Sequence, residues 1–238
     1  MSASFPARPK VPPAAATVAA VSALALVAAT LLSAAPDMPF ANYFGAIQPV
    51  TATLIVVVAA AAAHWILQSK SAFAVIRPEY LWRGLVVACA VGPLFAVPTV
   101  IADIALRFPV DINAPLPGAL LFYPLMGYVA ETAFHLVPLA LLVVSVRLVT
   151  GQPPRGGILC AVLVAVALVE PIVQASGTFN AATPGLLDVF VLVHLTAFSL
   201  VLLTLYRRYG FLAAFAFRLA YYLVWHIVWG WARLQFLF

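Results

Sequence analysis

The chain has 238 residues, of which 66% are hydrophobic and only 8% carry a charge. Soluble domains carry about 25% charged residues, and a folded chain of this length cannot hide so much apolar surface from water. The composition excludes a soluble domain and predicts an all-α, polytopic transmembrane helix bundle in a lipid bilayer. The net charge of +5 is expected to orient the protein in the membrane rather than to bind nucleic acid.

The chain divides into a short tail and one membrane domain. Residues 1–13 are basic and rich in proline, which predicts a disordered cytoplasmic tail, and residues 14–238 form a single transmembrane domain. A spanning helix needs about 20 apolar residues. Hydropathy, with Pro, Gly and charge at the breaks, predicts about seven spans. The expected spans are 14–35, 47–68, 82–102, 117–147, 157–176, 186–206 and 210–232.

Two of these spans have features of their own. The first begins after basic residues and ends on small ones, as a signal peptide does, but its longer apolar stretch favours an uncleaved helix. The fourth contains Pro124 and Pro138, which predict a kink or a strong tilt because proline interrupts helical hydrogen bonding.

Charge in the loops predicts the orientation. One side is expected to carry most of the basic residues: Arg8, Lys10, Lys70, Arg77, Arg83, Arg147, Arg155, Arg207 and Arg208. The other side is expected to carry Asp37, Asp103, Arg107, Asp111 and Arg233. Because Lys and Arg are retained in the cytoplasm, the N-terminus is expected there and the C-terminus outside. The expected location is the bacterial inner (plasma) membrane.

Several ionisable side chains fall inside the predicted spans, where each costs about 2.5–3.5 kcal/mol on insertion scales and suggests a function. They and a neighbouring tyrosine form the candidate site, within about residues 117–232: Glu131, His135, Glu170, His194, Tyr222 and His226. Glu131 and His135 are four residues apart and so share a helical face. At about 1.5 Å per residue, most of the set lies in the outer half of the bilayer, with Glu131 near the middle. Arg218 is the expected counter-ion of Glu131 or Glu170.

This set predicts hydrolysis of an amide bond without a metal or other cofactor. Glu131 is the expected general base and His194 its partner, because a carboxylate beside an imidazole can activate water. His226 and Tyr222 are expected to stabilise the oxyanion of the transition state. Glu170 and His135 are further candidates for the same site.

Short motifs resemble the glutamic-type intramembrane proteases of the CAAX-protease and bacteriocin-processing family, whose pattern is EExxxR, then FxxxH, then HxxxN. They are the stretch 130–135 (AETAFH), Phe190-x-x-x-His194, and the segment 205–211 leading into a polar last helix. The resemblance covers about residues 120–230. It implies cleavage of a membrane-associated peptide or of a lipidated protein.

The sequence departs from that family at three motif positions. Ala130 stands where the family has the first glutamate, which activates water there. His135 stands at the arginine position, and Arg218-x-x-x-Tyr222 replaces the third motif. These departures indicate a rebuilt or lost catalytic site, or a protein outside the family.

Two other classes of function remain open. A non-catalytic membrane protein, such as an immunity factor or an assembly partner, needs only the bundle, with the polar residues as interhelical hydrogen bonds. A bound metal is the other class: His135, His194 and His226 with a glutamate could ligate zinc. His194 and His226 could instead ligate haem, although aromatic residues are expected to crowd His226.

Overall fold

The computed structural model of the chain describes residues 14–35, 38–70, 73–178 and 185–238, and these parts are helical with short connections. Within them, seven segments are long and apolar enough to cross a membrane, which confirms the all-α polytopic bundle. The predicted tail of residues 1–13 lies outside the described residues.

Four of the spans are single helices: α1 (Ala14–Leu32), α3 (Pro49–Lys70), α4 (Leu81–Leu106) and α9 (Leu186–Tyr209). Three are composite: α5 (Ala119–Ala130) with η1 (Glu131–Leu136) and α6 (Val137–Thr150); α7 (Gly156–Ala167) with α8 (Val169–Thr178); and α10 (Phe211–Tyr222) with η2 (Leu223–Trp229) and α11 (Gly230–Phe236). A short helix, α2 (Phe40–Phe44), lies between the first two spans. The predicted spans match these bounds to about one helical turn.

Two of the composite spans contain a π-helical segment, η1 and η2. Pro138 follows η1 closely, and its missing N–H removes a helical hydrogen bond to the preceding turn. The span thus contains a π segment that Pro138 follows; the predicted kink or tilt stays a prediction. Such segments often occur at functional sites, and η1 carries Glu131 and His135 while η2 carries His226.

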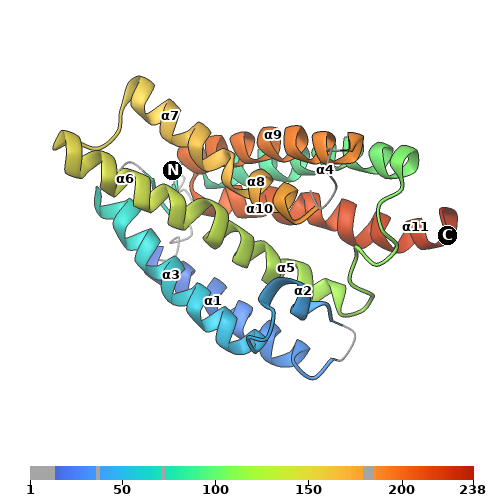
Figure 1. Cartoon of the computed structure of the whole chain (residues 1–238). Helices are drawn as coiled ribbons and strands as arrows, with labels where there is room; N and C mark the ends of the chain where they lie inside the picture. Colours follow the sequence, from blue (N-terminus) through green and yellow to red (C-terminus); the bar gives the residue numbers. More distant parts are fainter. Residues whose placement is uncertain (1–13, 36–37, 71–72, 179–184) are drawn as a thin grey trace, which may run out of the picture.

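Figure 1 shows two groups of helices that diverge toward one end of the molecule. In the first group α1 packs on α3 and α5, and α3 packs on α6; in the second α4 packs on α9 and α10. Contacts of α10 with α5, and of α8 with both α9 and η1, join the groups. The helices that carry the candidate residues therefore meet where the two groups converge.

Glycines on α4 allow α10 to approach closely. A Cβ atom on Gly84 would lie 3.0 Å from Cβ of Ala213, and one on Gly92 would lie 2.7 Å from the carbonyl oxygen of Phe217. Small residues permit such close contact between spanning helices, where packing rather than the hydrophobic effect drives association. This contact fixes the position of α10, the helix that carries Arg218.

A buried ion pair joins the end of α4 to α11. Arg233 donates from Nε to Oδ2 of Asp103 at 2.7 Å and from Nη2 to Oδ1 at 2.8 Å. Asp103 also accepts from the indole of Trp229 and the backbone N–H of Phe108. Both charged side chains are fully buried. The prediction that Asp103 and Arg233 are loop charges on one side of the membrane is wrong, because they neutralise each other inside the bundle.

Candidate functional site

Arg218 on α10 joins two carboxylates that come from two other spans. Its Nη1 donates to Oε1 of Glu170 at 2.9 Å, its Nη2 donates to Oε2 of Glu170 at 2.7 Å, and its Nε donates to Oε1 of Glu131. All three side chains are buried. The expected role of Arg218 as counter-ion is confirmed, and Arg218 pairs with both glutamates rather than with one.

Two further side chains complete this ionic cluster. His135 lies between the carboxylates, with Nδ1 3.4 Å from Oε2 of Glu131 and Nε2 3.9 Å from Oε2 of Glu170. Gln174, one turn along α8, donates to Oε1 of Glu170 at 3.1 Å. Glu170 therefore accepts three hydrogen bonds, and its carboxylate is well satisfied within the protein.

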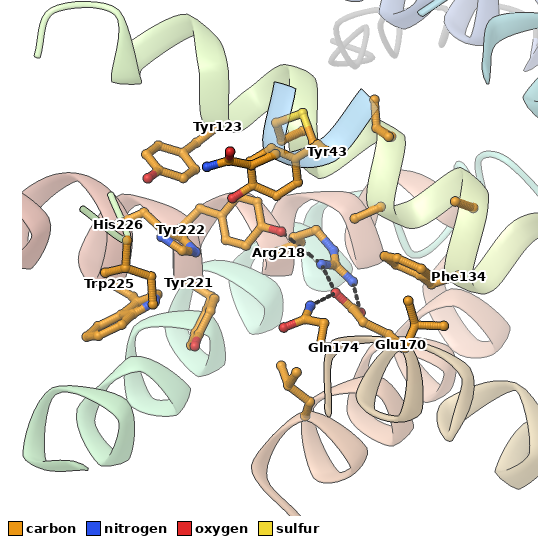
Figure 2. A pocket seen from close by; sticks show the side chains of 18 of the residues that line it. Tyr43, Tyr123, Phe134, Glu170, Gln174, Arg218, Tyr221, Tyr222, Trp225 and His226 are labelled. Carbon is orange, nitrogen blue, oxygen red and sulfur yellow. Dashed lines mark hydrogen bonds and ion pairs between the residues drawn. The ribbon is translucent and has the colours of Figure 1, made fainter. Parts of the chain in front are cut away.

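A cavity of about 760 Å³ lies beside the cluster. Its walls come from α2, α3, α5 and η1 and from α4, α8, α9, α10 and η2. Figure 2 shows the Arg218–Glu170 pair with Gln174 at one side of this space and a group of aromatic rings around the rest of it. Most of the lining is apolar. The polar groups that reach it include Glu170, His194, Tyr222 and His226.

His194 reaches the cavity from α9 and belongs to a separate polar chain. Its Nε2 lies 3.0 Å from Oγ1 of Thr99, and the same hydroxyl lies 3.1 Å from the hydroxyl of Tyr221. The imidazole is stacked on Phe190 with ring centres 5.2 Å apart. The Phe190-x-x-x-His194 motif therefore presents its histidine with the phenylalanine against the ring.

His226 reaches the same cavity from η2. Its Nδ1 lies 2.8 Å from Oδ1 of Asn113, and an amide oxygen can only accept, so this nitrogen carries the proton. The ring is stacked on Tyr123 at 4.3 Å, and Tyr222 and Trp225 also lie against it. The expected aromatic crowding around His226 is confirmed.

The structure divides the candidate residues into two sets. Glu170, His194, Tyr222 and His226 line one cavity, whereas Glu131 and His135 are buried behind its wall. Among the described side chains, Glu131 pairs with Arg218 and His135, and His194 bonds to Thr99. The expected pairing of Glu131 with His194 is wrong, because η1 turns Glu131 toward Arg218 rather than toward the cavity.

The histidines also do not form the zinc shell that was left open as an alternative. His135 lies in the ionic cluster, whereas His194 and His226 have separate hydrogen-bonding partners. Within the part of the chain that the structure describes, no three His, Cys, Asp or Glu side chains are placed to hold a metal ion.

Several residues that shape the site were missed from the sequence. They are Thr99, Asn113, Tyr123, Gln174 and Tyr221. Gln174 had a detectable signal, since it follows Glu170 by one turn inside an apolar span. Asn113 had none, because it lies in a loop that only the fold brings to His226.

The chain was compared with models of protein families, with curated proteins and with solved structures, and none of the three comparisons found a match.

Proposed function

We propose that this chain is a membrane-embedded binding protein whose cavity takes up an amphipathic molecule from the bilayer. The observation that carries this proposal is the cavity of about 760 Å³, which has a mainly apolar lining and a few convergent polar groups. Cavities of this size and character are the usual form of small-molecule sites.

Access from lipid follows from the exposure of residues at the cavity wall. Ile55 on α3 is 59% exposed and Val173 on α8 is 49% exposed, and both line the cavity. On spanning helices such surface faces lipid. A molecule dissolved in the bilayer can therefore approach the cavity from the lipid beside α3 or beside α8 without crossing water.

The hydrogen bonds that Glu131 and Glu170 already make favour binding over hydrolysis as the function. A general base must offer a lone pair to the proton that it removes. Glu131 does not line the cavity, and Glu170 already accepts from Arg218 and Gln174. Both carboxylates are therefore committed to holding three spans together.

Photolabelling tests this proposal. The purified protein is incubated with a lipid that carries a diazirine in its acyl chain, irradiated and digested, and the adducts are located by mass spectrometry. We expect adducts on Tyr221 and Tyr222, which line the cavity. Ala133→Trp, which fills the wall, should remove them, and Ala161→Trp on the exposed face of α7 should retain them. Adducts confined to lipid-facing residues in the wild type would contradict the proposal.

Hydrolysis of a peptide bond in a membrane-associated substrate is the second candidate function. It is favoured by the presence of Glu170, His194, Tyr222 and His226 around one cavity, together with the resemblance to glutamic intramembrane proteases. In this version Glu170 replaces Glu131 as the carboxylate nearest to the substrate. Reconstituted protein and a set of membrane-anchored peptides test it by mass spectrometry. Cleavage that Glu170→Gln abolishes supports a protease, and intact peptides contradict it.

A further inference from the structure

We infer that the cavity selects a hydrophobic cation, an organic ammonium or phosphonium ion with apolar substituents. This inference rests on the proposed binding function and names the chemical class of the ligand. It follows from the aromatic lining, from the charges at the wall and from the way in which Arg218 is already bound.

The lining is strongly enriched in aromatic rings. Phe, Tyr and Trp make up 12% of the chain but more than a third of the residues around the cavity. The rings of Tyr43, Phe134, Tyr221, Tyr222 and Trp225 stand around the open space in Figure 2. The face of an aromatic ring attracts a cation, and the attraction grows when the cation is removed from water.

The protein already holds one cation, the Arg218 guanidinium, against aromatic faces at the cavity wall. The guanidinium carbon of Arg218 lies 5.1 Å from the ring centre of Phe198 and 5.6 Å from that of Tyr222. Both rings line the cavity. The wall is therefore built to hold positive charge against aromatic faces.

The charges near the cavity are unequal in number. In the ionic cluster, the single guanidinium of Arg218 lies between the carboxylates of Glu131 and Glu170. Among the described residues that line the cavity, Glu170 and Arg218 are the charged ones. The cluster therefore has one acidic side chain in excess, and its negative charge is unbalanced unless a proton or a second cation accompanies it. Because an unbalanced charge inside a bilayer is costly, a cationic ligand gains from neutralising it.

An anion has no comparable site. Each nitrogen of the Arg218 guanidinium already donates a hydrogen bond, to Glu131, Glu170 or Tyr222. Arg218 is also the one Lys or Arg side chain among the described lining residues. Because four of the five guanidinium N–H groups are used in this way, an anionic ligand would have at most one N–H of Arg218 and would face the carboxylate of Glu170.

Two ions of the same shape and opposite charge test this inference. Tetraphenylphosphonium and tetraphenylborate are each titrated into the full-length protein in detergent, and tryptophan fluorescence is followed because Trp225 lines the cavity. Binding is corrected for partition into empty micelles. We expect tetraphenylphosphonium to bind at least about tenfold more tightly, which corresponds to about 1.4 kcal/mol. Equal affinities, tighter binding of tetraphenylborate, or no binding of either ion would overturn the inference.

Variants locate the binding site. Glu170→Gln removes the unbalanced charge and should weaken tetraphenylphosphonium binding about tenfold. Because that variant alters the ionic cluster, Phe134→Leu provides a second test outside it, with an expected loss of about threefold. Phe215→Leu is the matched control, since Phe215 is also partly buried but does not line the cavity. An equal loss in Phe134→Leu and Phe215→Leu would contradict the inference.

The two experiments distinguish a cavity that does not select cations from a cavity that does not bind amphiphiles at all. If the diazirine lipid labels Tyr221 and Tyr222 but the two ions bind equally, the cavity binds amphiphiles without selecting cations. If the lipid labels neither tyrosine, the binding function itself fails.

Discussion

Arg218 and Glu170 form a two-point ion pair between α10 and α8, with contacts of 2.9 Å and 2.7 Å between buried atoms. Arginine often makes two parallel hydrogen bonds of this kind to a carboxylate, because the planar guanidinium matches the carboxylate geometry. Through its Nε, Arg218 extends the pair to Glu131 on a third span. One side chain thus connects three helices and borders the cavity.

Removing Arg218 should destabilise the protein strongly. Arg218→Leu leaves two buried carboxylates without a counter-ion, and breaking a buried pair costs about 3–5 kcal/mol. Arg218→Lys should recover little of this, because an ammonium cannot make the same bidentate contact. Denaturant unfolding in micelles measures the loss. The triple variant Glu131→Gln, Glu170→Gln and Arg218→Leu should be more stable than Arg218→Leu alone, and wild-type stability of the single variant would contradict the arrangement.

The pair formed by Asp103 and Arg233 should be energetically coupled and should not affect binding. Asp103→Asn and Arg233→Met are each expected to cost about 3–5 kcal/mol, because each leaves a buried charge unpaired. The double variant should cost less than the sum of the two single variants, as expected of residues in direct contact. Additive losses in this cycle would show that the two side chains do not interact. Tetraphenylphosphonium affinity serves as the control and should stay the same in each folded variant.

The contact between α4 and α10 should not tolerate a side chain at Gly92. Gly92→Ala places a Cβ against the backbone of Phe217, and overpacking of this kind costs about 1–3 kcal/mol. The matched change Gly157→Ala has open space around its Cβ and should leave the stability unchanged or slightly higher. The midpoint of thermal unfolding distinguishes them. Equal midpoints for the two variants would mean that the helices are further apart than described.

Ala130→Glu tests the resemblance to glutamic proteases. Ala130 lines the cavity and occupies the position at which that family has its water-activating glutamate. A carboxylate placed there would face the cavity instead of Arg218. If the chain has the site arrangement of that family, the variant should cleave membrane-anchored peptides faster than the wild type does. Val129→Glu, at a neighbouring cavity position, is the control and should remain inactive; equal activity of the two variants would argue against the resemblance.

Much of the fold could be predicted from the sequence, because a bilayer demands long apolar helices and the chain interrupts them with proline, glycine and charge. The counter-ion role of Arg218 could also be predicted, since an arginine buried in a span needs a carboxylate. The prolines of the fourth span predicted a kink or a strong tilt, and the π segment η1 could not be predicted from them. These inferences depend on local sequence and on the solvent.

The composition of the cavity could not be predicted in the same way. Whether a side chain faces the cavity or the ionic cluster depends on the rotation of each helix, which η1 and η2 alter by their extra residue per turn. Glu131 consequently faces Arg218, whereas Glu170 faces both Arg218 and the cavity. The buried pair of Asp103 and Arg233 is 130 residues apart in sequence, and no local pattern connects its members.

Native mass spectrometry of the purified protein tests the central claim most directly. The wild type should retain a bound amphiphile after detergent is removed in the gas phase, visible as a discrete added mass. Ala133→Trp, which fills the cavity, should lose that mass, and Ala161→Trp should keep it. A wild type that shows the mass of the chain alone, or an added mass that persists equally in both variants, would contradict the claim that the cavity is a binding site.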